Sequence, residues 1–183
     1  MAAKLEPILT IADLDAMPED GNRYELIEGE LFVSRAPSLT HQDVVGNIFF
    51  LLRRFLHDNP IGKVWTGPGV IFSDFSGVIP DLVYIGNERL KEIATGNRVS
   101  GAPDLIVEVL SPGNENERRD RHAKRQLYRK YGVKEYWVVD PEKSTIEVYR
   151  TSRLRLVATL GLRQHISTPL LPGFRCSARD ILK

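Results

Sequence analysis

One glutamate, Glu108, interrupts an otherwise apolar run of the sequence at residues 105–110. Aliphatic and β-branched residues bounded by turn formers are typical of a strand that is buried on both faces of a sheet. An isolated carboxylate there is costly unless a fixed cation, a metal ion or a proton held by a raised pKa compensates it. Such compensation is typical of working sites. The alternative, a strand end where the acid reaches solvent, is disfavoured because Val109 and Leu110 continue the apolar run.

Length and composition restrict the class of protein but leave its partner open. With 183 residues, of which 42% are hydrophobic, we expect one domain over residues 1–183. The 25 basic and 24 acidic residues create no global field that attracts nucleic acid, although a local cleft would be enough for a nuclease. The lone Cys176 excludes an internal disulfide, and the N-terminus has no apolar segment of signal-peptide type, so we expect a cytoplasmic protein. Arg53 and Arg54 interrupt the longest apolar segment, which argues against a membrane helix.

Hydrophobic periodicity predicts a mixed β-sheet flanked by helices, of the α/β or α+β class. A hairpin is expected over residues 24–33, closed at Gly29, as an N-terminal extension. The expected strands cover residues 64–72, 79–85, 105–110, 135–140, 145–150 and 154–160. The expected helices cover residues 11–17, 88–94 and 114–131, with a further long helix that begins after Thr40 as its N-cap and a short closing helix after a loop at residues 169–174.

Asp81 is a second acid in a position that we expect to be nearly buried. It lies between Ile79 and Val83 on one face of its expected strand. If that strand pairs with the Glu108 strand, the two carboxylates converge and repel each other unless a divalent cation lies between them. Mg²⁺ suits such oxygen ligands. The alternative for Asp81 alone is a residue at a strand start that caps a local turn.

Lys124 is the one cation on the apolar stripe of its expected helix, together with Leu127 and Tyr128. Its ammonium can therefore point at the sheet, where it would orient a nucleophile and stabilise developing negative charge. The alternative is that its stem packs while its charge reaches water; the two acids favour the site. Five further cations lie on the opposite side of this helix: Arg118, Arg119, His122, Arg125 and Arg129. A solvated helix face explains them, although the arginines at the N-terminal end could reach a phosphate at the rim of a cleft.

Taken together, several motifs of this chain resemble those of the Uma-type family of restriction-endonuclease-like proteins, a branch of the PD-(D/E)xK nuclease superfamily. The resemblance covers about residues 22–150. The residues that carry it are Pro80 with Asp81, Glu108 to Ser111, Lys124 with Tyr128, Gly132 with Val133, residues 135–140, the hairpin at residues 24–29 and His41. It implies a restriction-endonuclease-like fold.

By the same resemblance, Asp81 and Glu108 are the metal-binding acids and the backbone carbonyl of Val109 is a further ligand. Glu25 matches the family's hairpin acid and would complete the metal environment or hold a water molecule; its alternative is an exposed strand glutamate. Leu110 occupies the position where the superfamily motif has its lysine. Lys124 matches the position of that lysine in this family, on the following helix. The competing interpretation is that Leu110 marks a site that has lost its lysine and is inactive.

His41 lies on the apolar side of its helix and is interpreted as a half-buried histidine outside the catalytic set. The sequence therefore predicts a metal-dependent endonuclease that hydrolyses DNA with Mg²⁺, or alternatively Mn²⁺. In this hypothesis Asp81 and Glu108 hold the ion and Lys124 positions the attacking water. Because duplex cleavage normally needs two sites, a homodimer is expected. The alternatives are a non-catalytic nucleic-acid- or protein-binding module of the same fold, and a metal hydrolase of small phosphoesters.

Overall fold

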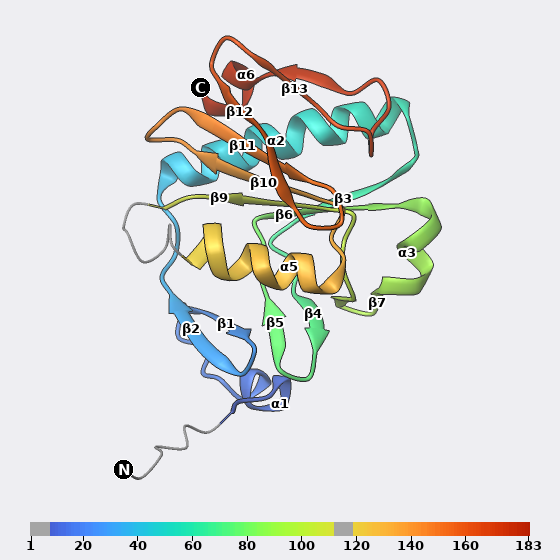
Figure 1. The fold of residues 1–183 in the computed structure, drawn as a ribbon. Coiled ribbons are helices and arrows are strands. Elements are labelled where there is room, and N and C mark those ends of the chain that lie inside the picture. Colours follow the sequence, from blue (N-terminus) through green and yellow to red (C-terminus); the bar gives the residue numbers. More distant parts are fainter. Residues whose placement is uncertain (1–7, 112–118) are drawn as a thin grey trace.

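Two strands that are buried along their entire length form the centre of the principal sheet in the computed structural model, which describes residues 8–111 and 119–183 (Figure 1). Because both faces of these strands exclude water, elements must cover the sheet on both sides. In spatial order the strands of this central sheet are β12 (Arg155–Gly161), β11 (Thr145–Arg150), β10 (Glu135–Asp140), β9 (Leu105–Val109), β6 (Leu82–Gly86) and β3 (Gly62–Thr66).

The connection between β9 and β10 carries the helix that covers one face of the central sheet. β9 and β10 run parallel, and parallel neighbours need a crossover instead of a tight turn. The described part of this crossover is a π-helical segment, η1 (Arg119–Lys124), followed directly by α5 (Arg125–Tyr131). Gly132 ends α5 with φ 84°, as its C-cap position predicts. The predicted start of this helix at Asn114 lies outside the described residues.

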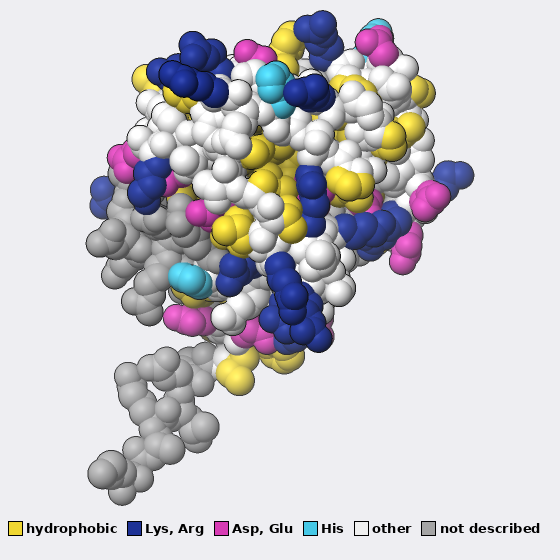
Figure 2. Space-filling view, turned by 45° about the horizontal axis from the view of Figure 1, so that its top comes forward, with side chains coloured by type: hydrophobic (Ala, Val, Ile, Leu, Met, Phe, Trp, Pro, Cys, Tyr) yellow, Lys and Arg dark blue, Asp and Glu magenta, His cyan; other side chains and the backbone are white. Residues whose placement is uncertain are grey.

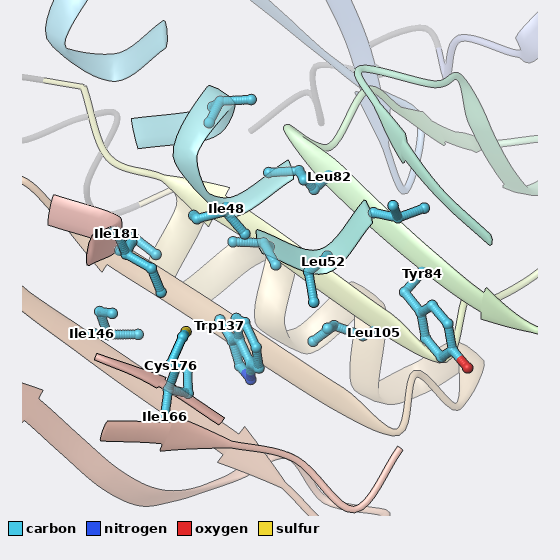
Figure 3. Close-up of a cluster of buried hydrophobic side chains, with 14 of the residues drawn as sticks. Ile48, Leu52, Leu82, Tyr84, Leu105, Trp137, Ile146, Ile166, Cys176 and Ile181 are labelled. Carbon is cyan, nitrogen blue, oxygen red and sulfur yellow. The ribbon is translucent and has the colours of Figure 1, made fainter. Parts of the chain in front are cut away.

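The opposite face of the central sheet is covered by α2 (Leu39–Asp58) and α6 (Ala178–Leu182). Figure 3 shows Ile48 and Leu52 of α2 above Leu105 and Trp137 of the sheet, and these four side chains are at most 1% exposed. Within residues 8–111 and 119–183, no helix is long and apolar enough to cross a membrane.

Alternation along β9 decides which of these two faces receives Glu108. Leu105, Val107 and Val109 belong to the hydrophobic cluster beneath α2. Ile106 and Leu110 belong to the cluster beneath α5. Since successive side chains of a strand point to opposite faces, Glu108 points to the α5 side.

A second six-stranded sheet packs on that same side, and the predicted hairpin is part of it. Glu28 and Gly29 close the hairpin with φ of 52° and 83°, the conformation of a tight two-residue turn. The hairpin is more than an extension, because Leu26 pairs with Gly77 of the next strand. In spatial order the strands are β2 (Glu30–Ser34), β1 (Arg23–Ile27), β5 (Ser76–Val78), β4 (Val70–Ser73), β8 (Arg98–Ser100) and β7 (Ala94–Thr95).

Two predicted strands were wrong in their bounds. Residues 64–72 do not form one strand, because Gly67, with φ 57°, and the following Pro68 divide them between β3 of the central sheet and β4 of the second sheet. Residues 79–85 begin as a connection, and β6 starts only at Leu82. Asp81 therefore precedes its strand.

The remaining elements agree with the sequence more closely. Helix α1 (Ile11–Asp15) lies within the predicted helix at residues 11–17 and begins with a capping box of Thr10 and Asp13, and α3 (Asn87–Ile93) occupies the predicted short helix. The closing helix is α6, but a two-stranded hairpin of β13 (His165–Ser167) and β14 (Arg175–Ser177) was not predicted. The N-cap of α2 was also wrong, because the hydroxyl that accepts the His41 N–H belongs to Ser38 and not to Thr40.

The two candidate caps of α2 can be compared directly. We expect Ser38→Ala to lower the free energy of unfolding by about 1 kcal/mol, because it removes the acceptor of a helix-terminal N–H. Thr40→Ala, a matched change two residues later, should stay within about 0.5 kcal/mol of the wild type. Urea unfolding followed by circular dichroism measures both. A larger loss in Thr40→Ala than in Ser38→Ala would contradict the observed cap.

Candidate active site

A cavity of about 380 Å³ lies where the carboxyl end of β9, the start of α2 and the end of η1 meet. It is called the site cavity below. Asp81, Glu108, Val109 and Lys124, four residues singled out from the sequence, all line it. The structure thus brings together the side chains of Asp81, Glu108 and Lys124, which lie 16 to 43 positions apart in the chain.

Glu108 is 2% exposed and its charge is met by two neighbours from the helix that crosses above it. Its Oε1 accepts a hydrogen bond from the Lys124 Nζ at 2.9 Å and from the Tyr128 hydroxyl at 2.6 Å. Burial, and then the charge of Glu108, raise the pKa of Tyr128 well above its ordinary value, so the phenol stays protonated and donates. A buried Glu108 was expected to need a fixed cation, a metal ion or a proton held by a raised pKa, and the structure provides a fixed cation, Lys124.

Lys124 is itself 1% exposed, so its ammonium does not reach solvent. Its Nζ lies 2.9 Å from Glu108 Oε1 and 2.9 Å from Glu25 Oε1. Lys124 therefore points at the sheet, as its place on the apolar stripe predicted. The alternative, in which its stem packs while its charge reaches water, is wrong. Lys124 is also the last residue of the π-helical segment η1, a geometry that is frequent at functional sites.

Glu25 joins this cluster from the second sheet. It is 1% exposed, which rules out the alternative of an exposed strand glutamate. Its Oε1 accepts the backbone N–H of Ile79 at 2.8 Å in addition to the Lys124 ammonium. Glu25 is thus a buried partner of Lys124.

Asp81 is 5% exposed and holds the other side of the site cavity. Its Oδ2 accepts the backbone N–H of Val109 at 2.8 Å, which ties it to the Glu108 strand. Its Oδ1 lies 3.1 Å from His41 Nε2 and 3.3 Å from Arg23 Nη1. Burial opposes ionisation, but the hydrogen bond and charge of His41, the Val109 N–H and the Lys124 charge together hold the pKa of Asp81 below its ordinary value.

His41 and Arg23 are site residues that the sequence interpretation missed. His41 is 5% exposed, and its Nδ1 lies 3.4 Å from the Ser111 hydroxyl while its Nε2 faces Asp81. A histidine on the inward side of a helix was taken for a packing residue, although the family resemblance already included it. Arg23 could have been found from alternation, because it shares a strand face with Glu25.

Leu110 lies away from this chemistry. It is 7% exposed and packs in the hydrophobic cluster beneath α5 with Leu127 and Tyr128. The ammonium in contact with Glu108 belongs to Lys124, on the segment that faces the strand.

The oxygen donors of Asp81, Glu108 and Val109 are of the type that Mg²⁺ prefers. Among the described residues, no three His, Cys, Asp or Glu side chains are grouped as a ready metal site. This is compatible with Mg²⁺, which is commonly held by one or two carboxylates together with substrate phosphates and water. The donor set is therefore of a kind that would fit a magnesium ion.

The basic helix face expected from the sequence is described only in part. Arg118 lies outside the described residues, as does the side chain of Arg119. The Arg125 guanidinium lies over the Tyr149 ring, 5.1 Å from its centroid. Neither Arg125 nor Arg129 lines the site cavity.

A family model described as "Putative restriction endonuclease", Uma2, matches residues 11–179. The chain belongs to the Uma2 family. No curated protein matches it. A crystal structure of "a putative nuclease belonging to DUF820" from Anabaena variabilis ATCC 29413 superposes with a TM-score of 0.79, covering 95% of this chain and 97% of that chain. At 19% identity this likeness shows the fold alone, and the predicted restriction-endonuclease-like fold of the Uma2 protein is thereby confirmed.

The depressed pKa of Asp81 leads to a pH dependence of stability. Its folded value lies below an unfolded value of about 3.9, so its ionic contacts stabilise the fold above about pH 4 and are lost as the pH falls through the folded value. We expect Asp81→Asn to lower the free energy of unfolding by about 2–3 kcal/mol at pH 7. That difference should shrink below about pH 4. Urea unfolding from pH 7 downwards tests this, and a difference that is constant with pH contradicts it.

Proposed function

We propose that this protein is a divalent-metal-dependent endonuclease that hydrolyses phosphodiester bonds in DNA. The observation that carries the proposal is the Lys124 ammonium, held against Glu108 in the same cavity as Asp81. Acids that can hold a divalent ion, and a cation beside them that can stabilise developing negative charge, are groups that metal-assisted phosphodiester hydrolysis can use. Here they come from three separate segments of the chain, and membership of a family described as restriction endonucleases supports the same reaction.

Asp81, Glu108 and the Val109 carbonyl are the proposed ligands of Mg²⁺, with Mn²⁺ as an alternative. When bound, such an ion acts as a Lewis acid on phosphoryl oxygen and makes water nucleophilic at neutral pH. The Glu108 and Asp81 oxygens that accept bonds from Lys124, Tyr128 and His41 would share or exchange these contacts with the ion. His41 and Arg23 orient Asp81 at the cavity wall.

Lys124 is the proposed catalytic cation. Because it is almost completely buried, its charge acts in a medium of low dielectric constant, where it stabilises negative charge more strongly than in water. Glu25 positions it by forming a second ion pair with the same ammonium. This arrangement favours an active site over the interpretation that Leu110 reports an inactive one, since the missing strand lysine has a substitute in contact with Glu108.

We also infer a homodimer and a cytoplasmic location. Cleavage of both strands of a duplex normally uses two copies of such a site. The sequence contains one cysteine, Cys176, which is buried, so the protein needs no oxidising compartment for a disulfide of its own. Sedimentation velocity of the purified protein tests the dimer.

The nuclease reaction can be tested with supercoiled plasmid and either Mg²⁺ or Mn²⁺. We expect the wild type to nick or linearise the plasmid and EDTA to stop it. Glu108→Gln keeps the shape of the side chain but removes the charge, and should lower the rate by about 10²–10³-fold. Lys91→Met, on the exposed side of α3, is the control and should cut at the wild-type rate.

Two outcomes would remove the proposal. One is a wild type that cuts no DNA and binds neither ion in calorimetry. The other is a Glu108→Gln variant that cuts as fast as the wild type. Hydrolysis of bis(p-nitrophenyl) phosphate without any cleavage of DNA would indicate a small-phosphoester hydrolase instead.

The contribution of Lys124 to catalysis can be separated from its contribution to the stability of the fold. Lys124→Met leaves two buried carboxylates without their shared cation, so it should lower the free energy of unfolding by about 3–5 kcal/mol. Lys124→Arg retains the charge and should recover most of the stability but less of the activity, because the planar guanidinium cannot take the position of a compact ammonium. Thermal unfolding and plasmid cleavage, measured on both variants, test this. Equal recovery of stability and activity would indicate a purely structural lysine.

A further inference from the structure

A second hollow of about 830 Å³ lies between α5 and the beginning of β12. Positive side chains gather in groups on the molecular surface, as Figure 2 illustrates for one face. In this hollow, named the arginine groove, five of the eight lining residues are cations and none is an acid: Arg125, Gln126, Arg129, Lys130, Arg153, Leu154, Arg155 and Leu156. In a chain with a net charge of +1, that is a strong local concentration of positive charge.

The walls of the groove are held in place by buried contacts. Arg125 lies over Tyr149, which is 5% exposed and stacks on Tyr136 with ring centroids 5.8 Å apart. On the other wall, Leu154 is 1% exposed and donates its N–H to the Thr151 carbonyl at 3.0 Å. Arg153 and Arg155 flank this anchored leucine and are exposed. The fold therefore presents these arginines from fixed backbone.

The charge of the groove is largely uncompensated within the described part of the chain. Lys130 pairs with Glu28 at 2.7 Å, with both side chains about half exposed. Arg129, Arg153 and Arg155 make no ion pair with a described residue. A solvated helix face would explain Arg129 at the carboxyl end of α5, but it does not explain why Arg153 and Arg155 line the other side of the same hollow.

The arginine groove and the site cavity are lined by consecutive parts of one helical segment. Arg125 directly follows Lys124, and at about 1.5 Å per residue the α5 residues of the groove lie within about 9 Å of Lys124 along the helix axis. Successive phosphates of one DNA strand rise by about 3.4 Å, so this distance corresponds to a few nucleotides. This axial separation is within the length of a single bound DNA duplex.

We propose that the arginine groove is a second nucleic-acid site, which binds the phosphate backbone of duplex DNA outside the site cavity. The choice of ligand rests on the proposed nuclease function. Four of its five cations are arginines, whose planar forks match phosphate oxygens. Its lining contains no aromatic ring among the described residues, so it lacks the stacking surface that single-stranded nucleic acid uses. Recognition is of the backbone and independent of base sequence.

The experiment measures binding of a fluorescein-labelled 30-base-pair duplex by anisotropy, in EDTA, across a series of salt concentrations. Arg153→Gln combined with Arg155→Gln should weaken binding about tenfold or more and reduce the slope of log K against log salt by about 2, at about 0.9 per lost phosphate contact. Arg163→Gln combined with Arg175→Gln makes the same charge change at exposed positions outside the groove and should leave the slope unchanged. Arg153→Lys combined with Arg155→Lys retains the charge and should retain the slope.

Several results would overturn the groove site. They are an unchanged slope in the glutamine double variant, an equal loss in the lysine double variant, and a stronger effect on a 30-nucleotide single strand than on the duplex. Competition by poly-L-glutamate as effective as that by DNA would indicate an acidic protein partner instead. Because binding in EDTA requires no cleavage, failure of the groove and failure of the nuclease reaction remain distinguishable.

Discussion

The buried ammonium of Lys124, shared by Glu25 and Glu108, is the contact on which the arrangement of the molecule depends. Glu25 lies on β1 of the second sheet and Glu108 on β9 of the central sheet, so one lysine joins the two sheets through η1. Each of these ions loses several kcal/mol of hydration on burial, and only close partners and additional hydrogen bonds offset that loss. Tyr128 and the Ile79 N–H provide those bonds. Asp81 has direct partners of its own in His41, Arg23 and the Val109 N–H.

The sequence was most informative where a side chain broke a periodic pattern. Glu108 was recognisable because it interrupts an apolar strand, and Lys124 because it is the cation on an apolar helical stripe. The direction of a side chain follows from the period of its own strand or helix, so the orientation of Glu108 and Lys124 could be predicted. The condition set for Asp81, that its strand pairs with the Glu108 strand, is met by β6 and β9, which brings Asp81 to that strand even though Asp81 itself precedes β6.

Features that depend on distant segments were not predictable in this way. The apolar residues on both sides of Gly67 and Pro68 look like one strand, yet they enter different sheets, because where a chain goes after a turn depends on which strands are available to pair. His41 looked like a packing residue because nothing near it in sequence reveals that its ring meets Asp81. The arginines of α5 looked like a solvated face because their opposite wall comes from residues 153–156, which a helical period cannot locate.

The shared lysine also has an evolutionary consequence. Glu25, Lys124 and Glu108 lie on three segments of the chain that are distant in sequence, and none of the three charges has water as a substitute partner, since each is at most 2% exposed. A replacement that removes one of these charges therefore leaves a buried neighbour without one of its ionic partners. We therefore expect substitutions at these three positions to be coupled, so that the hairpin that carries Glu25 and the strand that carries Glu108 constrain each other.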